Sequence, residues 1–379
     1  MLYRKFGKLD FEASILGFGC MRLPIFDGDA GKINEDEAIR MIRYAIDQGI
    51  NYIDTAYFYH KGQSEFLVGK ALQEGYREKV KLATKLPIGR AESYEDFDRL
   101  LNEQLSKLST DHIDFYLLHG LDRESWDKSR KLGVLRFLDQ ALADGRIRYA
   151  GFSFHDDYSV FQEIVDAYSW TFCQIQYNYM DSAYQAGTAG LKYAAAKGLA
   201  IIIMEPIKGG KLAKIPPDVI QELWDRSPIN RTPAEWALRW VWNHPEVTIV
   251  LSGMSTLDQV QENLNTASQS LPGSLISEEL ALIQKVKERY RSLTKVDCTA
   301  CGYCQPCPSG VDIPSNFTVY NDAYIYDDLA TSRRSYQQFF KEEERASACI
   351  ECGNCEEACP QHLKIRDYLK AVHHTLGAI

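Results

Sequence analysis

Short apolar runs alternate with amphipathic stretches along about the first 270 residues of the chain. Several of the apolar runs are nearly continuous, which is typical of parallel strands that are buried on both faces. A short hairpin between Tyr3 and Ile15 is expected to precede them. The runs predict strands at Ile15–Gly19, Ile50–Asp54, Val80–Thr84, Ile113–Leu118, Ile147–Phe152, Phe172–Gln176, Leu199–Met204 and Val247–Leu251.

Between these strands, apolar residues recur every three or four positions, which predicts helices. The first helix starts after Asn34, a predicted N-cap with Glu37 three residues on, and stops at Gly49. The others are expected at Ser64–Glu74, Tyr94–Leu108, Gly133–Asp144, Ser159–Tyr168, Ala186–Lys197, Pro233–Asn243 and Leu257–Thr266. Eight strands alternating with eight helices over about 270 residues predict an α/β fold of the (β/α)8 TIM barrel type. A doubly wound sheet is the alternative, but the phosphate fingerprint GxGxxG is missing after the first strand.

Composition narrows the class of protein. The 379 residues are 45% hydrophobic and 25% charged, as in ordinary globular proteins, and leave room for a second, smaller domain. A net charge of −9 argues against nucleic acid as a partner. The start, MLYRKFGKLD, lacks the apolar core of a secretory signal, and no apolar run reaches the roughly 20 residues of a membrane span. We therefore expect a cytoplasmic protein without a membrane span.

The ten cysteines fall into two groups. Cys20 and Cys173 are isolated, and we expect both to be buried as small apolar residues. The other eight form two tight runs, which are Cys298, Cys301, Cys304 and Cys307, and then Cys349, Cys352, Cys355 and Cys359. Clustered CxxC steps in a chain without a signal favour metal binding over disulfides. We expect a barrel over residues 1–275, a connecting helix over residues 276–297 and a ferredoxin-like domain over residues 298–379.

The second run has the spacing of a bacterial [4Fe–4S] ferredoxin, in which the fourth cysteine ligates the other cluster. The first run is one residue shorter before Cys307. Zinc and bare structural thiols are the alternatives. Two zinc sites would need only CxxC pairs and would give no role to the third close cysteine or to the prolines Pro308 and Pro360. All eight cysteines are thus predicted ligands of two [4Fe–4S] clusters. The helical sequence between the runs resembles an α-helical ferredoxin.

Polar residues stand where the predicted strands end, which is the active-site face of such a barrel. They are Asp54, Lys85, His119, Ser153, Gln176 and Ser252, with Tyr59 on the loop after the first of them. An acid, an ammonium, a phenol and an imidazole suit the reduction of a carbonyl, because the alkoxide left by hydride needs a proton. An adjacent Lys lowers the pKa of a phenol, a carboxylate holds that Lys in place, and a His orients the carbonyl.

Seven segments carry a family resemblance: IDTAYFYHKGQSE, LATKLP, HIDFYLLHG, GFSFH, QIQYN, MEPIKGG and TPAEWALRWVWNHPEVTIVLSGMSTLDQVQENL. In this order, over residues 1 to about 270, they resemble the aldo/keto reductase family. The resemblance implies a barrel that binds a nicotinamide cofactor without a Rossmann fold. It also implies a catalytic tetrad of Asp54, Tyr59, Lys85 and His119, in which the DTAxxY spacing selects Tyr59 rather than Tyr57.

The cofactor contacts implied by the resemblance match this chain less completely. They are Ser153, Gln176 and Met204 at the nicotinamide, Gly209 and Gly210 at the pyrophosphate, and Glu262 and Asn263 at the adenine. Phe154 stands where an Asn is usual, and Met204 where a Tyr often stacks. Thr256 and Gln259 replace the basic residue for a 2′-phosphate, so we expect no strong restriction to NADPH unless Lys208 or Lys211 supplies the charge.

The leading expectation is an NAD(P)-dependent oxidoreductase that interconverts a carbonyl and an alcohol and carries a dicluster iron–sulfur domain for electron transfer or structure. Its substrate is a small carbonyl or alcohol, and the iron–sulfur domain leaves room for a redox protein partner. The alternative is a nucleotide-sensing module for electron transfer or interaction, with little reductase activity. The complete tetrad favours the enzyme, because a sensor needs no pairing of Tyr59 with Lys85.

Overall fold

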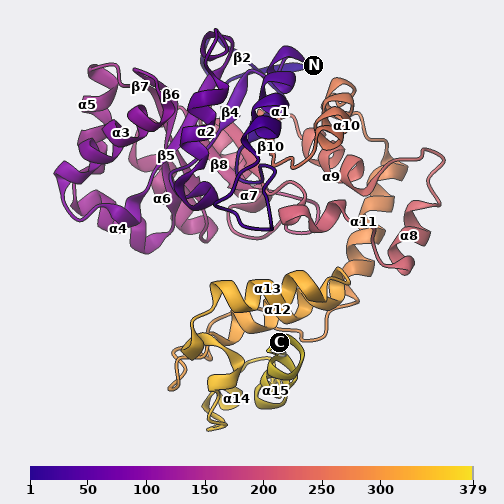
Figure 1. Ribbon diagram of the computed structural model, residues 1–379. Coiled ribbons are helices and arrows are strands. Elements are labelled where there is room, and N and C mark those ends of the chain that lie inside the picture. Colours follow the sequence, from indigo (N-terminus) through magenta and orange to yellow (C-terminus); the bar gives the residue numbers. More distant parts are fainter. Residues whose placement is uncertain (378–379) are drawn as a thin grey trace. The chain divides into compact units, whose positions relative to one another are not determined.

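The computed structural model describes residues 1–377, and most of its elements are labelled in Figure 1. By contacts the chain divides into two compact units. The first unit comprises Met1–Gly210 and Ala234–Ile276, and the second comprises Lys211–Pro233 and the chain from Ser277 onward. Residues 211–233 therefore group with the C-terminal part, although they lie within the stretch 1–275 that was expected to form the barrel.

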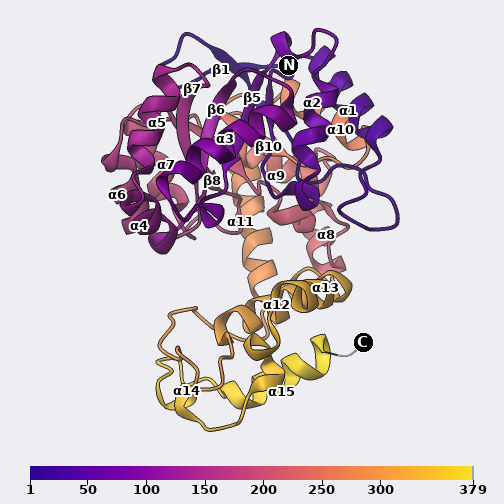
Figure 2. The ribbon, with the colours of Figure 1, turned by 60° about the vertical axis from the view of Figure 1, so that its left-hand side comes forward.

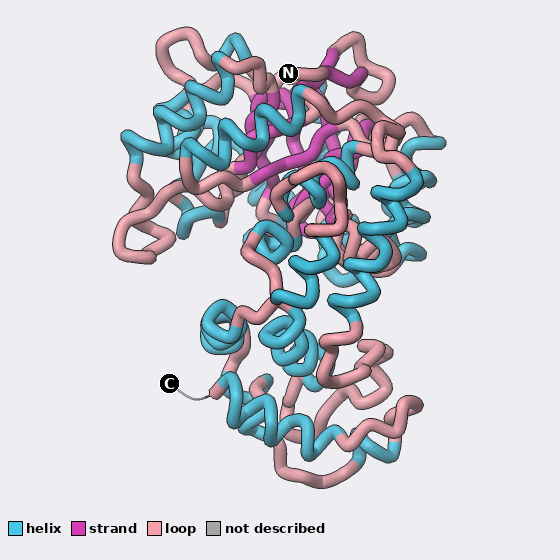
Figure 3. Tube along the Cα trace, turned by 90° about the vertical axis from the view of Figure 1, so that its right-hand side faces the viewer, coloured by secondary structure: helices cyan, strands magenta, loops and turns pink. Residues whose placement is uncertain are grey.

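The first unit is a closed barrel of eight parallel strands, which confirms the predicted fold and excludes the doubly wound sheet. Figure 3 shows these strands surrounded by helices. The strand order around the barrel is β10, β3, β4, β5, β6, β7, β8 and β9. Their bounds are β3 (Leu16–Gly19), β4 (Tyr52–Asp54), β5 (Lys81–Leu86), β6 (Ile113–Leu121), β7 (Ile147–Phe154), β8 (Phe172–Gln176), β9 (Ala200–Met204) and β10 (Ile249–Ser252).

An antiparallel hairpin of β1 (Tyr3–Lys5) and β2 (Glu12–Ser14) precedes the barrel, as predicted, and Figure 2 shows β1 close to the N-terminus. The hairpin loop contributes Phe6, whose ring centroid lies 4.4 Å from that of Phe115. Phe115, Phe172 and Ile249 come from the first residues of their strands and are fully buried. Apolar side chains thus fill the end of the barrel where the strands begin, which leaves polar chemistry to the opposite end.

The helices of the first unit match the predicted positions to within a few residues, with one addition. They are α1 (Glu35–Asp47), α2 (Ser64–Ala71), α3 (Tyr94–Leu108), α4 (Arg123–Lys131), α5 (Val134–Ala143), α6 (Tyr158–Ala167), α7 (Gly187–Ala196), α9 (Pro233–Trp242) and α10 (Leu257–Ser268). The addition is α4, which the hydrophobic pattern missed because it buries only Trp126 and Ser129. Asp122 caps its first turn through a hydrogen bond from the Ser125 amide.

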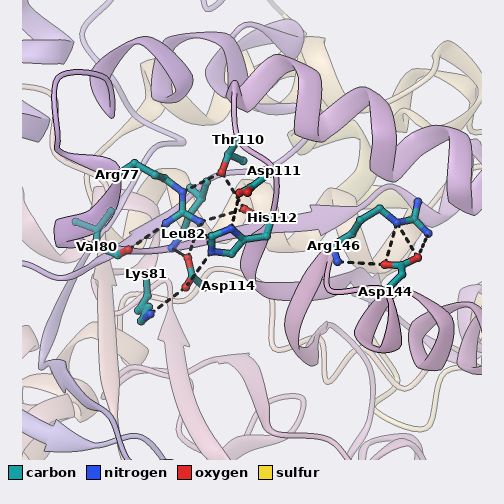
Figure 4. Close-up of polar contacts among 10 residues, drawn as sticks. All are labelled: Arg77, Val80, Lys81, Leu82, Thr110, Asp111, His112, Asp114, Asp144 and Arg146. Carbon is teal, nitrogen blue, oxygen red and sulfur yellow. Dashed lines mark hydrogen bonds and ion pairs between the residues drawn. The ribbon is translucent and has the colours of Figure 1, made fainter.

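A buried carboxylate joins the beginnings of β5 and β6, as Figure 4 shows. Asp114 is 2% exposed and accepts a hydrogen bond of 3.0 Å from the Leu82 amide. It also pairs with Arg77 at 2.8 Å and with Lys81 at 3.1 Å. Burial by itself would raise the pKa of Asp114, but the Arg77 charge and the Leu82 amide outweigh it and hold this pKa below its ordinary value. This cluster lies at the opposite end of the strands from the candidate site, so its role is structural.

The second unit is helical. It contains α8 (Asp218–Trp224), α11 (Ser277–Arg291), α12 (Ile313–Ile325), α13 (Leu329–Phe339), α14 (Asn354–Glu357) and α15 (Ile365–Leu376). Its core includes the buried side chains of Val296, Phe317, Tyr336 and Leu369. The segment 211–233 is tied into this unit by ion pairs, namely Lys211 with Asp322, Lys214 with Asp328 and Arg231 with Glu279. Among the described residues no helix combines the length and the apolar character needed to cross a membrane.

Candidate active site

Three of the four predicted catalytic side chains meet at the ends of the barrel strands. Asp54 is the last residue of β4, Lys85 is the last but one of β5, and Tyr59 opens the 3-10 turn Tyr59–Gly62 that follows β4. The Lys85 Nζ donates to Asp54 Oδ1 at 2.6 Å, to the Thr55 carbonyl at 2.8 Å and to the Tyr59 hydroxyl at 3.4 Å. Lys85 is 1% exposed and Asp54 2% exposed, so this ion pair is shielded from water.

His119, on β6, completes the group. Its ring centroid lies 6.2 Å from that of Tyr59, and the two rings meet edge to face at 82°. Burial, together with the Lys85 charge, lowers the pKa of His119 to about 3. The imidazole is therefore neutral at physiological pH, with one nitrogen as a hydrogen-bond donor and the other as an acceptor.

The electrostatics of the cluster keep the lysine charged and the tyrosine protonated. Burial by itself would lower the pKa of the Lys85 ammonium, but the Asp54 carboxylate outweighs it and holds this pKa above its ordinary value. Burial also raises the pKa of Asp54, against the Lys85 charge. The pKa of the Tyr59 phenol is raised by burial as well, and the Lys85 charge opposes this rise without cancelling it. Lys85 does lower the phenol's pKa, as expected, but burial is the larger effect and leaves this pKa above its ordinary value.

The first turn of α2 contacts Thr55, whose carbonyl accepts from the Lys85 ammonium. The Ser64 hydroxyl lies 2.8 Å from the Thr55 hydroxyl and donates to the Cys20 carbonyl at 3.0 Å. Sequence reasoning missed Thr55, because its contribution to Lys85 is a backbone carbonyl that carries no side-chain signal.

A second contact runs through Gln104, whose side-chain amide donates to the buried Glu65 at 2.6 Å and to the Lys85 carbonyl at 3.0 Å. Lys85 is thus held at its ammonium by the Thr55 carbonyl and at its own carbonyl by Gln104.

The predicted nicotinamide contacts lie at the ends of the next three strands. The Ser153 hydroxyl, on β7, accepts a hydrogen bond of 2.7 Å from the Gly120 amide. Gln176 ends β8 and is 6% exposed, and its Nε2 has no partner among the described residues. A buried amide donor without a partner costs free energy unless a ligand accepts from it. A carboxamide oxygen would do so, so this residue fits the nicotinamide end of the cofactor. Met204 ends β9 and is partly exposed.

The predicted contacts to the rest of the cofactor follow β9 and β10. Gly209 and Gly210 lie in the turn Lys208–Ala213 with φ of 63° and 97°, a backbone that favours glycine. Asn263 on α10 is buried and donates to the Ser252 hydroxyl at 3.0 Å. Its neighbour Glu262 lies on the same helix.

Neither residue at the expected 2′-phosphate position carries a charge. Thr256 caps α10 by accepting from the Gln259 amide. The Gln259 side chain in turn accepts from the Ser255 amide at 2.8 Å.

In the second unit, cysteines of both runs line each of two cavities, and Cys304 lines both of them. One cavity, of about 200 Å³, is lined by Cys349, Cys352 and Cys355 together with Cys304 and Cys307. A smaller cavity is lined by Cys298, Cys301 and Cys304 together with Cys359.

The runs also share a local feature, because the Ala300 amide lies 3.4 Å from the Cys298 Sγ and the Glu351 amide 3.4 Å from the Cys349 Sγ. An amide donor beside a cysteine sulfur is a contact that suits a ligand of an iron–sulfur cluster.

Comparison with protein families divides the chain in the same order. The model of the aldo/keto reductase family matches residues 15–287. The model of the 4Fe-4S dicluster domain matches residues 297–363. The first match covers the barrel and the second covers all eight clustered cysteines.

Individual relatives match part of the chain. The chain is 36% identical to the probable aldo-keto reductase 1 of Glycine max over 157 residues, which span 39% of this chain and 44% of that protein. It is 26% identical to the uncharacterized oxidoreductase YqkF of Bacillus subtilis, over 75% of this chain and 96% of that protein. It is also 26% identical to the L-galactose dehydrogenase of Arabidopsis thaliana, over 77% and 96%. Among solved structures, the holo form of aldo-keto reductase AKR11C1 from Bacillus halodurans superposes with a TM-score of 0.63 at 29% identity, over 76% of this chain and 96% of that one.

Proposed function

Because this chain belongs to the aldo/keto reductase family and is an oxidoreductase with a 4Fe-4S dicluster domain, we propose that it interconverts a carbonyl and an alcohol by hydride transfer. The observation that carries the proposal is the convergence of Asp54 and Tyr59 on the Lys85 ammonium. A protein that only senses nucleotides would not need the Tyr59 hydroxyl beside the Lys85 ammonium. The substrate is a small aldehyde, ketone or alcohol, and the cofactor is NAD(P)(H).

The residues of this chain supply the proton and hold the substrate. Bound NAD(P)H supplies the hydride to the carbonyl carbon. Tyr59, protonated because its pKa is raised, donates its hydroxyl proton to the carbonyl oxygen. Lys85 then stabilises the phenolate that remains, and Asp54 keeps Lys85 charged and in place. His119 is neutral and adds a hydrogen-bond donor that orients the carbonyl oxygen. In the oxidation of an alcohol the same groups act in reverse.

The cofactor contacts and the clusters belong to the same proposal. Ser153, Gln176 and Met204 hold the nicotinamide, Gly209 and Gly210 the pyrophosphate, and Glu262 and Asn263 the adenine. We assign one [4Fe–4S] cluster to Cys298, Cys301, Cys304 and Cys359, and the other to Cys349, Cys352, Cys355 and Cys307. The grouping of these cysteines around two cavities supports the crossed assignment. The clusters serve electron transfer with a redox protein partner, or structure, in a cytoplasmic enzyme.

The test is Tyr59→Phe, with Tyr57→Phe as the matched control. Tyr57 lies two residues away and donates its hydroxyl to Glu103 at 3.0 Å, outside the Lys85 cluster. The holoprotein is purified without oxygen and assayed with NADH or NADPH and a small aromatic aldehyde. We expect Tyr59→Phe to lose roughly 10²–10⁴ in kcat while its affinity for the cofactor, followed by fluorescence titration, stays the same. Equal turnover by Tyr59→Phe and the wild type would contradict the assignment.

A further inference from the structure

Arg22 crosses between the two loops that follow β9 and β10. A Cβ atom on Gly253 would meet the Arg22 Cγ at 2.8 Å and its Cβ at 3.0 Å. The aliphatic part of Arg22 therefore lies directly on Gly253, where any larger residue would displace it. At its far end, Nη2 lies 3.5 Å from the position that a Cβ on Gly209 would take. The guanidinium thus rests over the glycine turn of the β9 loop.

The main chain of Arg22 is fixed to the beginning of α10. Its carbonyl accepts a hydrogen bond of 2.8 Å from the Ser255 hydroxyl. The Ser255 amide in turn donates to the Gln259 side chain at 2.8 Å. The residue is anchored on the β10 side while its side chain reaches the β9 side, so its direction is set by the fold.

The N–H donors of the Arg22 guanidinium have no partner among the described residues. Within residues 1–377 it makes no hydrogen bond or ion pair with another residue. The three lysines between β9 and α8, by contrast, are each paired with a carboxylate. Lys208 pairs with Asp181 at 2.6 Å, Lys211 with Asp322 and Lys214 with Asp328. Arg22 is therefore the cation beside Gly209 whose planar fork of N–H groups is available to a ligand.

We propose that Arg22 binds the pyrophosphate of the dinucleotide cofactor, an inference that rests on the proposed function. A guanidinium recognises phosphate oxygens through two parallel charge-assisted hydrogen bonds. Its Nη2 lies over Gly209, in the turn proposed to hold the pyrophosphate, and this position assigns it to the pyrophosphate rather than to a 2′-phosphate. Since the pyrophosphate is common to both cofactors, Arg22 favours NADH and NADPH equally.

The experiment measures the Kd of the anaerobic holoprotein for NADH and for NADPH, without substrate. Loss of charged hydrogen bonds in Arg22→Gln should raise both Kd values roughly ten- to hundredfold. Arg22→Lys should recover only part of this loss, because an ammonium lacks the fork. Lys61→Gln is the control for the loss of a positive charge, since Lys61 is exposed and pairs with Asp29.

Gly253→Ala is a second variant, which keeps the cation but displaces its stem, and it should weaken both cofactors as well. Unchanged Kd values in Arg22→Gln would overturn the inference. Weakening of NADPH alone would also overturn it, because the charge would then serve the 2′-phosphate. A wild-type protein that binds neither cofactor would contradict both the proposed function and this inference. If the wild type binds the cofactors and Arg22→Gln binds them equally well, only the inference is contradicted.

Discussion

Replacing Lys85 with Met should cost the barrel stability as well as activity. Lys85 and Asp54 form a buried ion pair at 2.6 Å, and the second carboxylate oxygen of Asp54 has no partner among the described residues. Without the ammonium, a charge that is 2% exposed is left without its partner. Breaking a buried pair in this way costs about 3–5 kcal/mol. At about 2–4 °C per kcal/mol, the melting temperature of the barrel should fall by about 6–20 °C.

The double variant Asp54→Leu/Lys85→Met separates the two losses. It replaces both members of the pair with apolar residues of similar size, which is often neutral or stabilising. The double variant should therefore melt within a few degrees of the wild type and still be inactive with an aldehyde and NAD(P)H. The measurement is differential scanning calorimetry of the anaerobic holoprotein, beside the steady-state assay.

The stability lost in Lys85→Met should also depend on pH. Burial raises the pKa of Asp54, and in the variant the lysine no longer opposes this. A carboxylate whose pKa is higher in the folded than in the unfolded state stabilises the fold below its unfolded pKa, and this stabilisation is lost as pH rises through the folded pKa. The difference in melting temperature from the wild type should thus widen between pH 5 and pH 8. A single variant that melts like the wild type, or a double variant that melts as low as the single, would refute this reasoning.

Two further predictions concern the clusters and the far end of the barrel. Cys359→Ser should disturb the cluster of Cys298, Cys301 and Cys304 rather than that of its own run. Electron paramagnetic resonance of the reduced protein would show which cluster is lost, and iron analysis would compare the variant with the roughly eight iron atoms expected per wild-type chain. Asp114→Asn should lower the free energy of unfolding by about 3 kcal/mol at pH 7 without changing kcat. Because the pKa of Asp114 is lower in the folded state, its contribution to stability is present above the unfolded pKa and is lost as pH falls through the folded pKa. The free energies of unfolding of variant and wild type, measured by urea denaturation, should therefore differ less at pH 3 than at pH 7. An equal difference at both pH values would argue against this role of Asp114.

The barrel could be predicted because several of its buried strands are near-continuous apolar runs, and because polar residues stand at or next to the ends of six of the eight predicted strands. That rule located Asp54, Lys85 and His119 before any distance was known. It could not locate α4, whose buried face is limited to Trp126 and Ser129.

Contacts between distant residues were also out of reach. The Thr55 carbonyl matters through its position beside the lysine, which no residue type signals. Nothing in the sequence distinguishes Arg22 from other arginines, because its contacts with Gly209 and Gly253 form only when the loops after β3, β9 and β10 come together. The net rise in the pKa of Tyr59 likewise depends on burial that spacing does not reveal.

The grouping of residues 211–233 with the C-terminal part of the chain has a consequence for the order in which the protein is made. Lys211 precedes its partner Asp322 by 111 residues, and Lys214 precedes Asp328 by 114. At roughly 5–20 residues per second, a ribosome needs about 6–20 s to bridge that interval. During this time β10 can emerge and close the barrel, while the segment that runs out between β9 and α9 waits for its partners. A chain whose synthesis stops early would therefore have a closed barrel and one long loop, residues 211–233, without its ion-pair partners. Proteases would be expected to cleave such an incomplete chain first in that loop.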